Sequence, residues 1–418
     1  MKAVNSSQVN GSIRAPASKS VMIRAAAASL LAAGTSYLLN PSLCADSLAA
    51  LGIVETLGAD VEFDRKCVSI RGTGGLSMKG FRKNTINCGE SGLCMRMFTP
   101  ITGLMPYRFV IEGSGSLNLR PMAALEALSD LGVFCETSGG YPPVIVRGPM
   151  KGGNITLDAS TTSQFLTGLL MTAPLCREET AIAVTNLKSK PYVAMTLELL
   201  KDFGISVDHD SGLTSFRIRG NQCYEARTYR IEGDWSGAAF LLVAGAIAGS
   251  IEVKGLKTDS FQADRAVLEG LRRAGALVET GDDNVLVRKS DLMAFEFDAA
   301  DCPDLVPPLA ALAANCRGKS LIHGAGRLKH KESDRAAALV SEFARLSIKI
   351  RISGDTMEIY GGKPMGDLVD SHNDHRIAMA CAIAALNGER PVMIDNYQCV
   401  AKSYPDFFRD VRSVQVMS

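Results

Sequence analysis

A short polar motif occurs six times along the chain, and each copy stands just before a long run rich in alanine and leucine. The copies recur about every 70 residues. They are Ser18-Lys19-Ser20, Glu90-Ser91-Gly92, Thr162-Ser163-Gln164, Asp234-Trp235-Ser236, Pro303-Asp304 and Asn373-Asp374-His375-Arg376. A repeat of this length requires a similar group of helices and strands in every copy, so the period constrains the architecture more than any other feature.

A second feature recurs within the period, at the junction where an amphipathic helix ends and a strand begins. Glycine occupies this junction in four copies, at Gly58, Gly132, Gly204 and Gly275. Glycine suits the left-handed residue that ends a helix. A fifth copy, Leu346-Ser347-Ile348, lacks the glycine. The residues beyond the junction alternate in polarity, as in 216–219, which is the period of a strand.

Each repeat therefore predicts a strand, an alanine-rich helix, a strand, an amphipathic helix and two further strands. The alanine-rich helices, such as 236–249, are apolar nearly all round, which predicts burial. The amphipathic helices, such as 121–131, should lie nearer the surface.

The repeats predict an α/β (α+β) fold of two domains, each of three βαβαββ repeats with buried central helices, and a cleft between the domains. We expect the N-terminal domain at 16–231. The C-terminal domain should combine 1–15 with 232–418, because the first dozen residues resemble a strand added to the second group of repeats.

Composition excludes several classes of protein. The 418 residues include 45 basic and 44 acidic side chains, without the basic excess of a general nucleic-acid binder. Eleven cysteines without CxxC pairs indicate reduced thiols and a cytoplasmic protein. The N-terminus has no secretory h-region, and the apolar run 238–251 is too short for a membrane span. We expect a cytoplasmic monomer that binds neither nucleic acid nor membrane.

The polar motifs themselves predict anion binding. Each reads as the start of a helix, where free backbone N–H groups and the helix dipole favour negative charge. Several of the six starts also carry Lys or Arg. Together they predict a site for a phosphorylated or carboxylated ligand. His372 and His375 have a spacing that metal ligands also use, but no Cys or carboxylate cluster completes a zinc site.

Some of the polar and charged residues could serve the structure, as helix caps or solvated side chains, instead of binding a ligand. Ser18 can cap its helix, and Arg24 needs a partner within the apolar helix that follows. The segment 331–335 resembles a solvated charge run, but its place in register with Arg120 and Lys402 favours ligand binding. Arg376 opposes the dipole at a helix start, and a bound anion would offset that cost.

Taken in order, the motifs resemble the enolpyruvyl transferases, and within them the branch that acts on shikimate 3-phosphate. The resemblance spans Lys19 to Phe408. The matching segments are Ser18-Lys19-Ser20 with Arg24, Gly92 with Met95-Arg96, Arg120-Pro121, Ser163-Gln164-Phe165-Leu166, Ser189-Lys190-Pro191-Tyr192, Glu232-Gly233-Asp234, Pro303-Asp304, Lys331-Glu332 with Asp334-Arg335, Asn373-Asp374-His375-Arg376, and Lys402 before Pro405.

The resemblance implies a reaction and its substrates. Enolpyruvyl would pass from phosphoenolpyruvate to the 5-hydroxyl of shikimate 3-phosphate, with release of phosphate, in the shikimate pathway toward chorismate and the aromatic amino acids. It also implies two domains that close on these two small molecules. No metal or organic cofactor is implied.

The resemblance also implies the site residues. Shikimate 3-phosphate would be held by Lys19, Ser20, Arg24, Thr162, Ser163, Gln164, Ser189, Asp304 and Lys331. Phosphoenolpyruvate would be held by Lys19, Gly92, Arg120, Gln164, Arg335, Arg376 and Lys402. Asp304 would accept the proton of the attacking hydroxyl, and Glu332 and Lys19 are candidates for proton transfer at the methylene carbon.

Some positions depart from the family pattern. Glu90 stands where the family usually has Asn, Leu93 and Met97 replace Thr and Pro, and Arg327 stands in place of Asn. Thr162 replaces a serine and keeps the hydroxyl. We expect these changes to affect the affinity for phosphoenolpyruvate rather than the class of reaction.

Two rival functions fit the sequence less well. The UDP-N-acetylglucosamine enolpyruvyl transferases carry a reactive Cys in the loop before an Arg-Pro pair, whereas 113–121 has none. A non-catalytic binding protein on the same scaffold would be free to lose catalytic residues. Lys19, Asp304, Glu332 and Lys402 are all present.

Overall fold

The computed structural model describes residues 1–76 and 83–416 of the chain. Its contacts divide the chain into two compact units. The N-terminal unit is Ala17–Ile231, and the C-terminal unit combines Met1–Pro16 with Glu232–Ser418.

The N-terminal unit contains three consecutive groups of helices and strands. The first holds α1 (Lys19–Leu31), β3 (Ala32–Leu39), α2 (Ala45–Thr56), β4 (Asp60–Phe63) and β5 (Cys67–Thr73). The second holds β6 (Thr85–Asn87), α3 (Gly92–Thr102), β7 (Phe109–Glu112), the 3₁₀ helices η1 (Gly115–Leu119) and η2 (Ala123–Leu131), β8 (Phe134–Ser138) and β9 (Tyr141–Arg147). The third holds β10 (Gly153–Asp158), α4 (Gln164–Thr172), η3 (Ala173–Leu175), β11 (Thr180–Thr185), α5 (Lys190–Asp202), β12 (Asp208–His209) and β13 (Ser215–Ile218), followed by β14 (Tyr224–Glu225) and β15 (Thr228–Arg230).

The C-terminal unit also contains three groups, of which the first two follow the same order and the third ends in helices instead of a strand hairpin. The first strand of the chain, β1 (Lys2–Val4), belongs to the sheet of the third group. The first group holds β2 (Val9–Arg14), α6 (Trp235–Ala248), β16 (Gly249–Lys254), η4 (Ala263–Ala266), α7 (Val267–Arg273), β17 (Leu277–Thr280) and β18 (Asn284–Arg288). The second holds β19 (Glu296–Asp298), η5 (Pro303–Leu305), α8 (Val306–Ala314), β20 (Lys319–His323), η6 (Ala325–His330), α9 (Arg335–Arg345), β21 (Lys349–Ser353) and β22 (Thr356–Tyr360). The third holds β23 (Leu368–Asp370), α10 (His375–Ala384), η7 (Ala385–Asn387), β24 (Val392–Asp395), η8 (Tyr397–Lys402) and α11 (Phe407–Ser413).

A typical sheet joins a parallel pair to an antiparallel hairpin. In the sheet β6-β7-β9-β8, β6 runs parallel to β7 with Ile86 opposite Ile111, and β9 runs antiparallel to β7 with Val144 opposite Ile111. The parallel pair needs a crossover, which α3 supplies. The sheets led by β10, β2 and β19 repeat this order, which is the βαβαββ pattern predicted from the period.

Strands that are distant in sequence pair with each other in three of the sheets. β15 pairs parallel with β3 and takes the first position of the opening repeat. β2 pairs parallel with β16, and β1 pairs antiparallel with β24. The expectation that the first dozen residues add strand structure to the second group is therefore confirmed. The chain enters the C-terminal unit, crosses to the N-terminal unit and returns.

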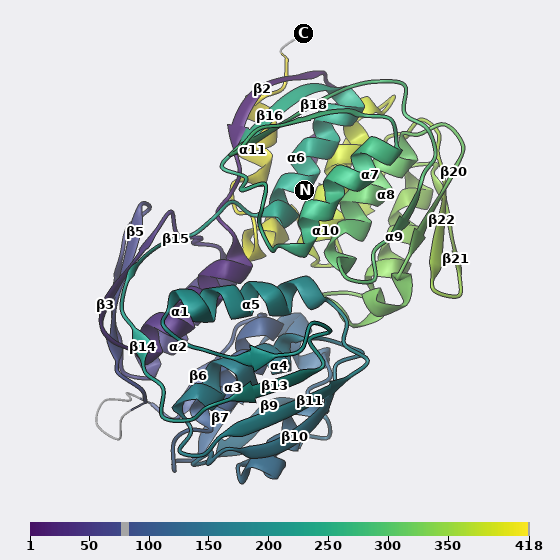
Figure 1. The fold of residues 1–418 in the computed structure, drawn as a ribbon. Coiled ribbons are helices and arrows are strands. Elements are labelled where there is room, and N and C mark those ends of the chain that lie inside the picture. The colour runs from purple at the N-terminus through teal and green to yellow at the C-terminus, as the bar shows by residue number, and fades with distance from the viewer. Residues whose placement is uncertain (77–82, 417–418) are drawn as a thin grey trace. The chain divides into compact units, whose positions relative to one another are not determined.

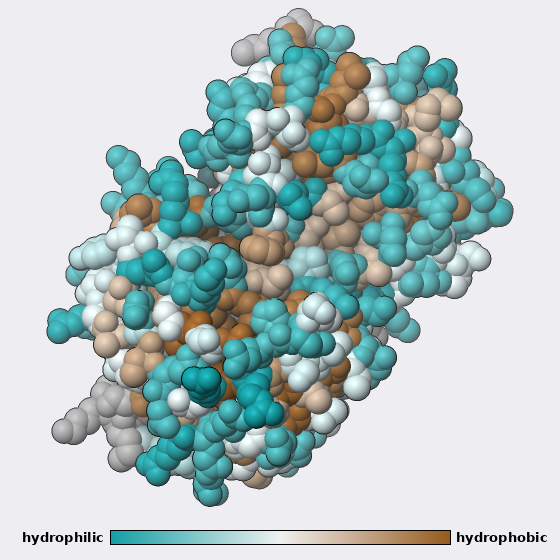
Figure 2. Space-filling view, viewed as in Figure 1, coloured by the Kyte–Doolittle hydropathy of each residue, from teal (hydrophilic) through white to brown (hydrophobic). Residues whose placement is uncertain are grey.

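The alanine-rich helices form the cores of the two units. All of α6 is buried apart from Ser236, and α1 is buried from Val21 to Leu31. Helices α6, α8 and α10 contact one another within their unit, and α3 contacts both α1 and α4 in the other (Figure 1). In Figure 2 hydrophilic side chains cover most of the margins of the visible face, and hydrophobic side chains show in patches between them. A helix that is apolar on every side has no face suited to water, so the sheets enclose it.

The helix-to-strand junctions adopt the predicted left-handed geometry. Gly132 has φ +79°, and Ser347, in the copy without glycine, has φ +60°. The position thus requires positive φ even where the residue has a Cβ. The amphipathic helix expected at 121–131 is a 3₁₀ helix over Ala123–Leu131. Its buried leucines recur every third residue, which aligns them on one face of a 3₁₀ helix.

The residues that the structure describes include no helix long and apolar enough to cross a membrane.

Candidate active-site residues in the two units

Asp304 lies among three cationic side chains in the C-terminal unit. It is part of η5, the short turn that leads into α8. Its carboxylate accepts from Arg335 Nη1 at 2.9 Å and lies 3.3 Å from both Lys331 Nζ and Arg376 Nη2. The side chain remains 24% exposed. The three cationic side chains hold the Asp304 side chain in place, and part of it stays exposed.

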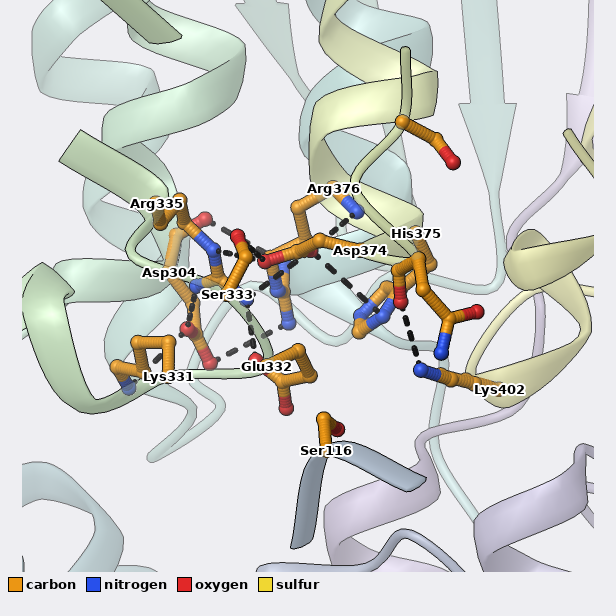
Figure 3. Close-up of polar contacts among 12 residues, drawn as sticks. Ser116, Asp304, Lys331, Glu332, Ser333, Arg335, Asp374, His375, Arg376 and Lys402 are labelled. Carbon is orange, nitrogen blue, oxygen red and sulfur yellow. Dashed lines mark hydrogen bonds and ion pairs between the residues drawn. The ribbon is translucent and has the colours of Figure 1, made fainter. Parts of the chain in front are cut away.

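Arg335 connects the acidic residues of this cluster. It begins α9 and is fully buried. Besides Asp304, it contacts Glu332 Oε2 at 2.5 Å and Asp374 Oδ2 at 2.9 Å (Figure 3). Burial by itself lowers the pKa of Arg335, but the charges of Asp374, Glu332 and Asp304 outweigh it and raise that pKa above the ordinary value. A buried guanidinium is tolerated here because its donors meet carboxylates.

Asp374 organises the start of α10. Its carboxylate accepts from the Arg376 backbone N–H at 2.9 Å and from Ser333 Oγ at 3.1 Å. Burial raises the pKa of Asp374, and the charge of Arg335 more than reverses this, so the pKa lies below its ordinary value. Arg376 was expected to need an anion at this helix start. In the structure a protein carboxylate, that of Asp304, already lies beside its guanidinium.

The two lysines of the C-terminal unit that were predicted as site residues, Lys331 and Lys402, have different surroundings. Burial lowers the pKa of Lys331, and the charge of Asp304 opposes part of that effect. Lys402, at the end of η8, donates from Nζ to the Asn373 carbonyl at 2.6 Å. Arg327, which stands where the family often has Asn, donates from Nη1 to the Ala300 carbonyl at 2.6 Å.

Asp264 belongs to the same charged surroundings, although it was not selected from the sequence. It lies on η4, is fully buried, and accepts a hydrogen bond from Ser236 Oγ at the start of α6. Burial raises its pKa to about 6, the charge of Asp304 adds to the rise, and Arg376 opposes it. Asp259 and Glu269, the neighbouring acidic residues in the sequence, are exposed, so no local pattern distinguished Asp264.

The start of α1 in the N-terminal unit carries Lys19. Its Nζ lies 3.0 Å from Asp46 Oδ2, on the first turn of α2. Ser18 caps α1 by accepting from the Val21 backbone N–H, as its sequence position suggested. Ser20 lies in the first turn of the helix and is half-buried. Asp46 was missed from the sequence, where it looked like an ordinary acidic residue at a helix start.

Arg24 obtains its partners from two other helices. Its Nε donates to Thr196 Oγ1 at 2.9 Å on α5, and its Nη2 donates to Thr167 Oγ1 at 3.3 Å on α4. Nη1 donates to the Ser20 carbonyl at 2.9 Å. Burial lowers the pKa of Arg24 to about 10, partly offset by Tyr192, so the side chain stays cationic at neutral pH. The two threonines were not predicted, because a hydroxyl in a helix has no distinguishing pattern in sequence.

Gly92, at the start of α3, lies against two guanidinium groups. A Cβ at Gly92 would fall 2.8 Å from both Arg120 Nη1 and Arg96 Nη1. Arg96 Nη1 also donates to Gln164 Oε1 at 2.8 Å, on the first residue of α4. The structure therefore brings three predicted residues, Gly92, Arg120 and Gln164, together around Arg96. Both arginines are buried.

The remaining predicted residues of this unit lie at helix starts. Thr162 Oγ1 accepts from the Gln164 backbone N–H at 3.2 Å, and the buried Ser163 precedes α4. Ser189 is buried just before α5 and has φ +58°. Leu93 and Met97 are both buried on α3 and pack in the hydrophobic core. Their replacement of Thr and Pro therefore affects core packing rather than an exposed surface.

The two histidines with metal-like spacing have protein partners. His372 Nε2 lies 2.8 Å from Glu342 Oε1, and His375 Nδ1 lies 4.0 Å from Asp374 Oδ1. Within residues 1–76 and 83–416, no group of three or more His, Cys, Asp or Glu side chains is arranged to hold a metal ion.

Comparison with known proteins places the chain in a family. The chain belongs to the EPSP synthase (3-phosphoshikimate 1-carboxyvinyltransferase) family, whose model matches residues 4–411. A 3-phosphoshikimate 1-carboxyvinyltransferase of Methanocorpusculum labreanum is 37% identical over 414 residues, covering 98% of this chain and 97% of the relative. One from Thermococcus kodakarensis is 38% identical over 406 residues, with 97% of each covered. A solved EPSP synthase from Acinetobacter baumannii has the same fold, with a TM-score of 0.82 at 24% identity over 99% of this chain and 98% of that chain.

Proposed function

We propose that this protein transfers enolpyruvyl from phosphoenolpyruvate to the 5-hydroxyl of shikimate 3-phosphate and releases phosphate. Family membership over nearly the full length supports the reaction. The observation that carries the chemistry is the partly exposed side chain of Asp304, which Lys331, Arg335 and Arg376 hold in place. We further propose a cytoplasmic monomer, in keeping with its eleven free cysteines.

Cationic and neutral donors at the helix starts account for the binding of two anionic substrates. We assign shikimate 3-phosphate to Lys19, Ser20, Arg24, Thr162, Ser163, Gln164, Ser189, Asp304 and Lys331. We assign phosphoenolpyruvate to Lys19, Gly92, Arg120, Gln164, Arg335, Arg376 and Lys402. Buried arginines suit this task, because part of their desolvation cost is already met in the folded protein. Arg96, bonded to Gln164 and adjacent to Gly92, joins this list as a supporting residue.

The reaction requires proton transfer at two atoms. In the addition step, the 5-hydroxyl oxygen bonds to the central carbon of phosphoenolpyruvate, loses its proton to Asp304, and the methylene carbon gains a proton. In the elimination step, the carbon–oxygen bond to phosphate breaks and the methyl carbon gives up a proton. Glu332 and Lys19 are our candidates for the exchanges at carbon. Glu332 is fixed for this role by its contact with Arg335.

A phosphate-release assay tests the proposal. Purified protein is incubated with both substrates, and with each substrate alone, and the product is identified by mass spectrometry. We expect release only when both are present, with one enolpyruvyl ether formed per phosphate. A further reaction replaces shikimate 3-phosphate with UDP-N-acetylglucosamine. Turnover in that reaction alone would overturn the proposal in favour of the rival transferase, and size-exclusion chromatography with light scattering tests the monomer.

A further inference from the structure

Glu90 is a carboxylate at a position where the sequence pattern expects an amide, close to Gly92 at the start of α3. A negative charge there would be expected to repel an anionic substrate. In the structure the Glu90 carboxylate is engaged by the protein itself. Its Oε2 accepts from the Ser116 backbone N–H at 3.0 Å and from Ser116 Oγ at 2.7 Å.

The contact fixes the beginning of η1. Ser114 N–H donates to the Gly89 carbonyl at 2.8 Å, one residue before Glu90, so backbone and side chain bind the same turn. Gly115 has φ +51°, and a Cβ there would lie 2.6 Å from the carboxyl carbon of Glu90. The turn therefore approaches Glu90 as closely as a residue without a side chain allows.

The 3₁₀ helix η1 connects Ser116, which binds Glu90, to Arg120. Leu117 of η1 is fully buried, and its carbonyl accepts from the Arg120 backbone N–H at 3.0 Å. On the other side of Arg120, the Pro121 carbonyl accepts from Arg96 Nη2 at 2.8 Å. The backbone at Arg120 is thus fixed from both directions, by Glu90 through η1 and by Arg96 directly. Its guanidinium lies over Gly92.

We propose that Glu90 is a positioning residue, which holds η1 through Ser116 and thereby places Arg120 for phosphoenolpyruvate. This inference rests on the proposed function and on the assignment of Arg120 to that substrate. On this inference, the main effect of Glu90 is to position Arg120, and repulsion of phosphoenolpyruvate is the smaller effect. The hydrogen bonds from Ser116 draw the carboxylate toward the backbone, where its charge is partly balanced by two donors.

The two interpretations predict opposite signs for one measurement. If the charge of Glu90 mainly repels phosphoenolpyruvate, its removal lowers the KM for that substrate. If Glu90 mainly positions Arg120, its removal raises that KM. Glu90→Gln retains an acceptor oxygen for Ser116 and removes the charge, so it separates the hydrogen bond from the charge.

The test uses four variants of the full chain and steady-state kinetics with both substrates. They are Glu90→Ala, Glu90→Gln, Ser116→Ala and the control Glu112→Ala. Glu112 is an exposed carboxylate on β7, so the control removes one negative charge from the same unit. We expect Glu90→Ala to raise the KM for phosphoenolpyruvate about tenfold, because the variant loses the hydrogen bonds from Ser116 to a charged group. The KM for shikimate 3-phosphate should change less than twofold.

The remaining variants distinguish positioning from a general structural role. Glu90→Gln should recover most of the loss, and Glu112→Ala should match the unaltered protein. Ser116→Ala keeps the backbone donor and should raise the same KM about threefold, which keeps the test decisive if Glu90→Ala fails to fold. An unchanged or lower KM in Glu90→Ala or Ser116→Ala overturns the inference. Absence of turnover in the unaltered protein would instead count against the proposed function.

Discussion

Arg335 and Asp304 form an ion pair at 2.9 Å in which the guanidinium is fully buried and the carboxylate is 24% exposed. The buried partner is fixed from inside by Asp374 and Glu332. The exposed partner is thereby oriented without being enclosed. Such a pair can hold a reactive carboxylate in one position while leaving it accessible to a substrate hydroxyl.

Replacement of Asp304 by asparagine tests its role as a base. Asp304→Asn keeps the shape of the side chain but cannot accept a proton. We expect turnover to fall at least about a hundredfold, the usual cost of losing a positioned base. Binding of shikimate 3-phosphate, measured by calorimetry, should persist. Three cations contact Asp304, and asparagine removes the charge that balances them, so a modest fall in Tm is expected.

Asp334 provides the matched control for that experiment. It caps α9 by accepting from the Ala337 backbone N–H at 3.1 Å, so asparagine should replace it with little loss. Asp334→Asn should keep turnover within twofold. Near-normal turnover in Asp304→Asn would remove Asp304 from the chemistry and make Glu332 the next candidate.

Gly92→Ala should weaken phosphoenolpyruvate binding specifically. The added methyl would lie 2.8 Å from the terminal nitrogens of Arg120 and Arg96, so both guanidinium groups must shift. We expect the KM for phosphoenolpyruvate to rise about tenfold or more, with a smaller change in kcat. Gly52→Ala, on α2 with open space around the new Cβ, is the control. Equal kinetics for the two variants would show that the guanidinium groups move freely.

Thr196→Val should loosen Arg24 and lower the affinity for shikimate 3-phosphate. Valine has a similar volume but removes the hydroxyl that accepts from Arg24 Nε. A buried donor left without its acceptor costs about 1 to 3 kcal/mol in unfolding free energy. We expect that loss in urea unfolding and a several-fold higher KM for shikimate 3-phosphate.

Thr56→Val is the control for the arginine contact. Thr56 and Thr196 each donate to the carbonyl four residues earlier in their helix, but Thr196 also accepts from an arginine. A fall in stability at Thr56 as large as that at Thr196 would attribute the effect to the helix rather than to Arg24.

Asp264→Asn should change how stability depends on pH. In the folded protein burial raises the Asp264 pKa from 3.8 to about 6, whereas in the unfolded chain it keeps the lower value. Between these values the folded state binds more protons at Asp264, so the contribution of Asp264 to stability falls as pH rises from about 4 to about 6. Asparagine keeps an acceptor for Ser236 and removes the free-energy cost of ionising a buried carboxyl group. The variant should be roughly 1 to 3 kcal/mol more stable at pH 7.

The measurement is urea unfolding of both proteins at several values from pH 5 to pH 8. The stability difference between them should shrink toward acid pH, where the native carboxyl is already protonated. Asp282→Asn, at an exposed position, should show no such trend. A variant that is less stable than the unaltered protein at pH 7 would mean that the Asp264 carboxylate is stabilised by its neighbours despite its burial.

Local features of the sequence were sufficient for the architecture. The period, the all-round apolar helices and the glycine junctions each depend on residues close in the chain, so they can be read without a structure. The same holds for Ser18, whose cap contacts a residue three positions away. The 3₁₀ geometry of η2 was not distinguished from an α-helix, because a leucine every third residue is compatible with both.

The charged network was decided by tertiary structure. The motifs marked Lys19, Arg24, Asp304 and Arg335 as candidates, but their partners lie far along the chain: Arg24 meets Thr196 across 172 residues, and Arg335 meets Asp374 across 39. Packing of the central helices determines which donor meets which acceptor, and no local period encodes that choice. For the same reason Glu90 appeared from sequence to be a repelling charge, and only the folded chain shows its carboxylate bound to Ser116.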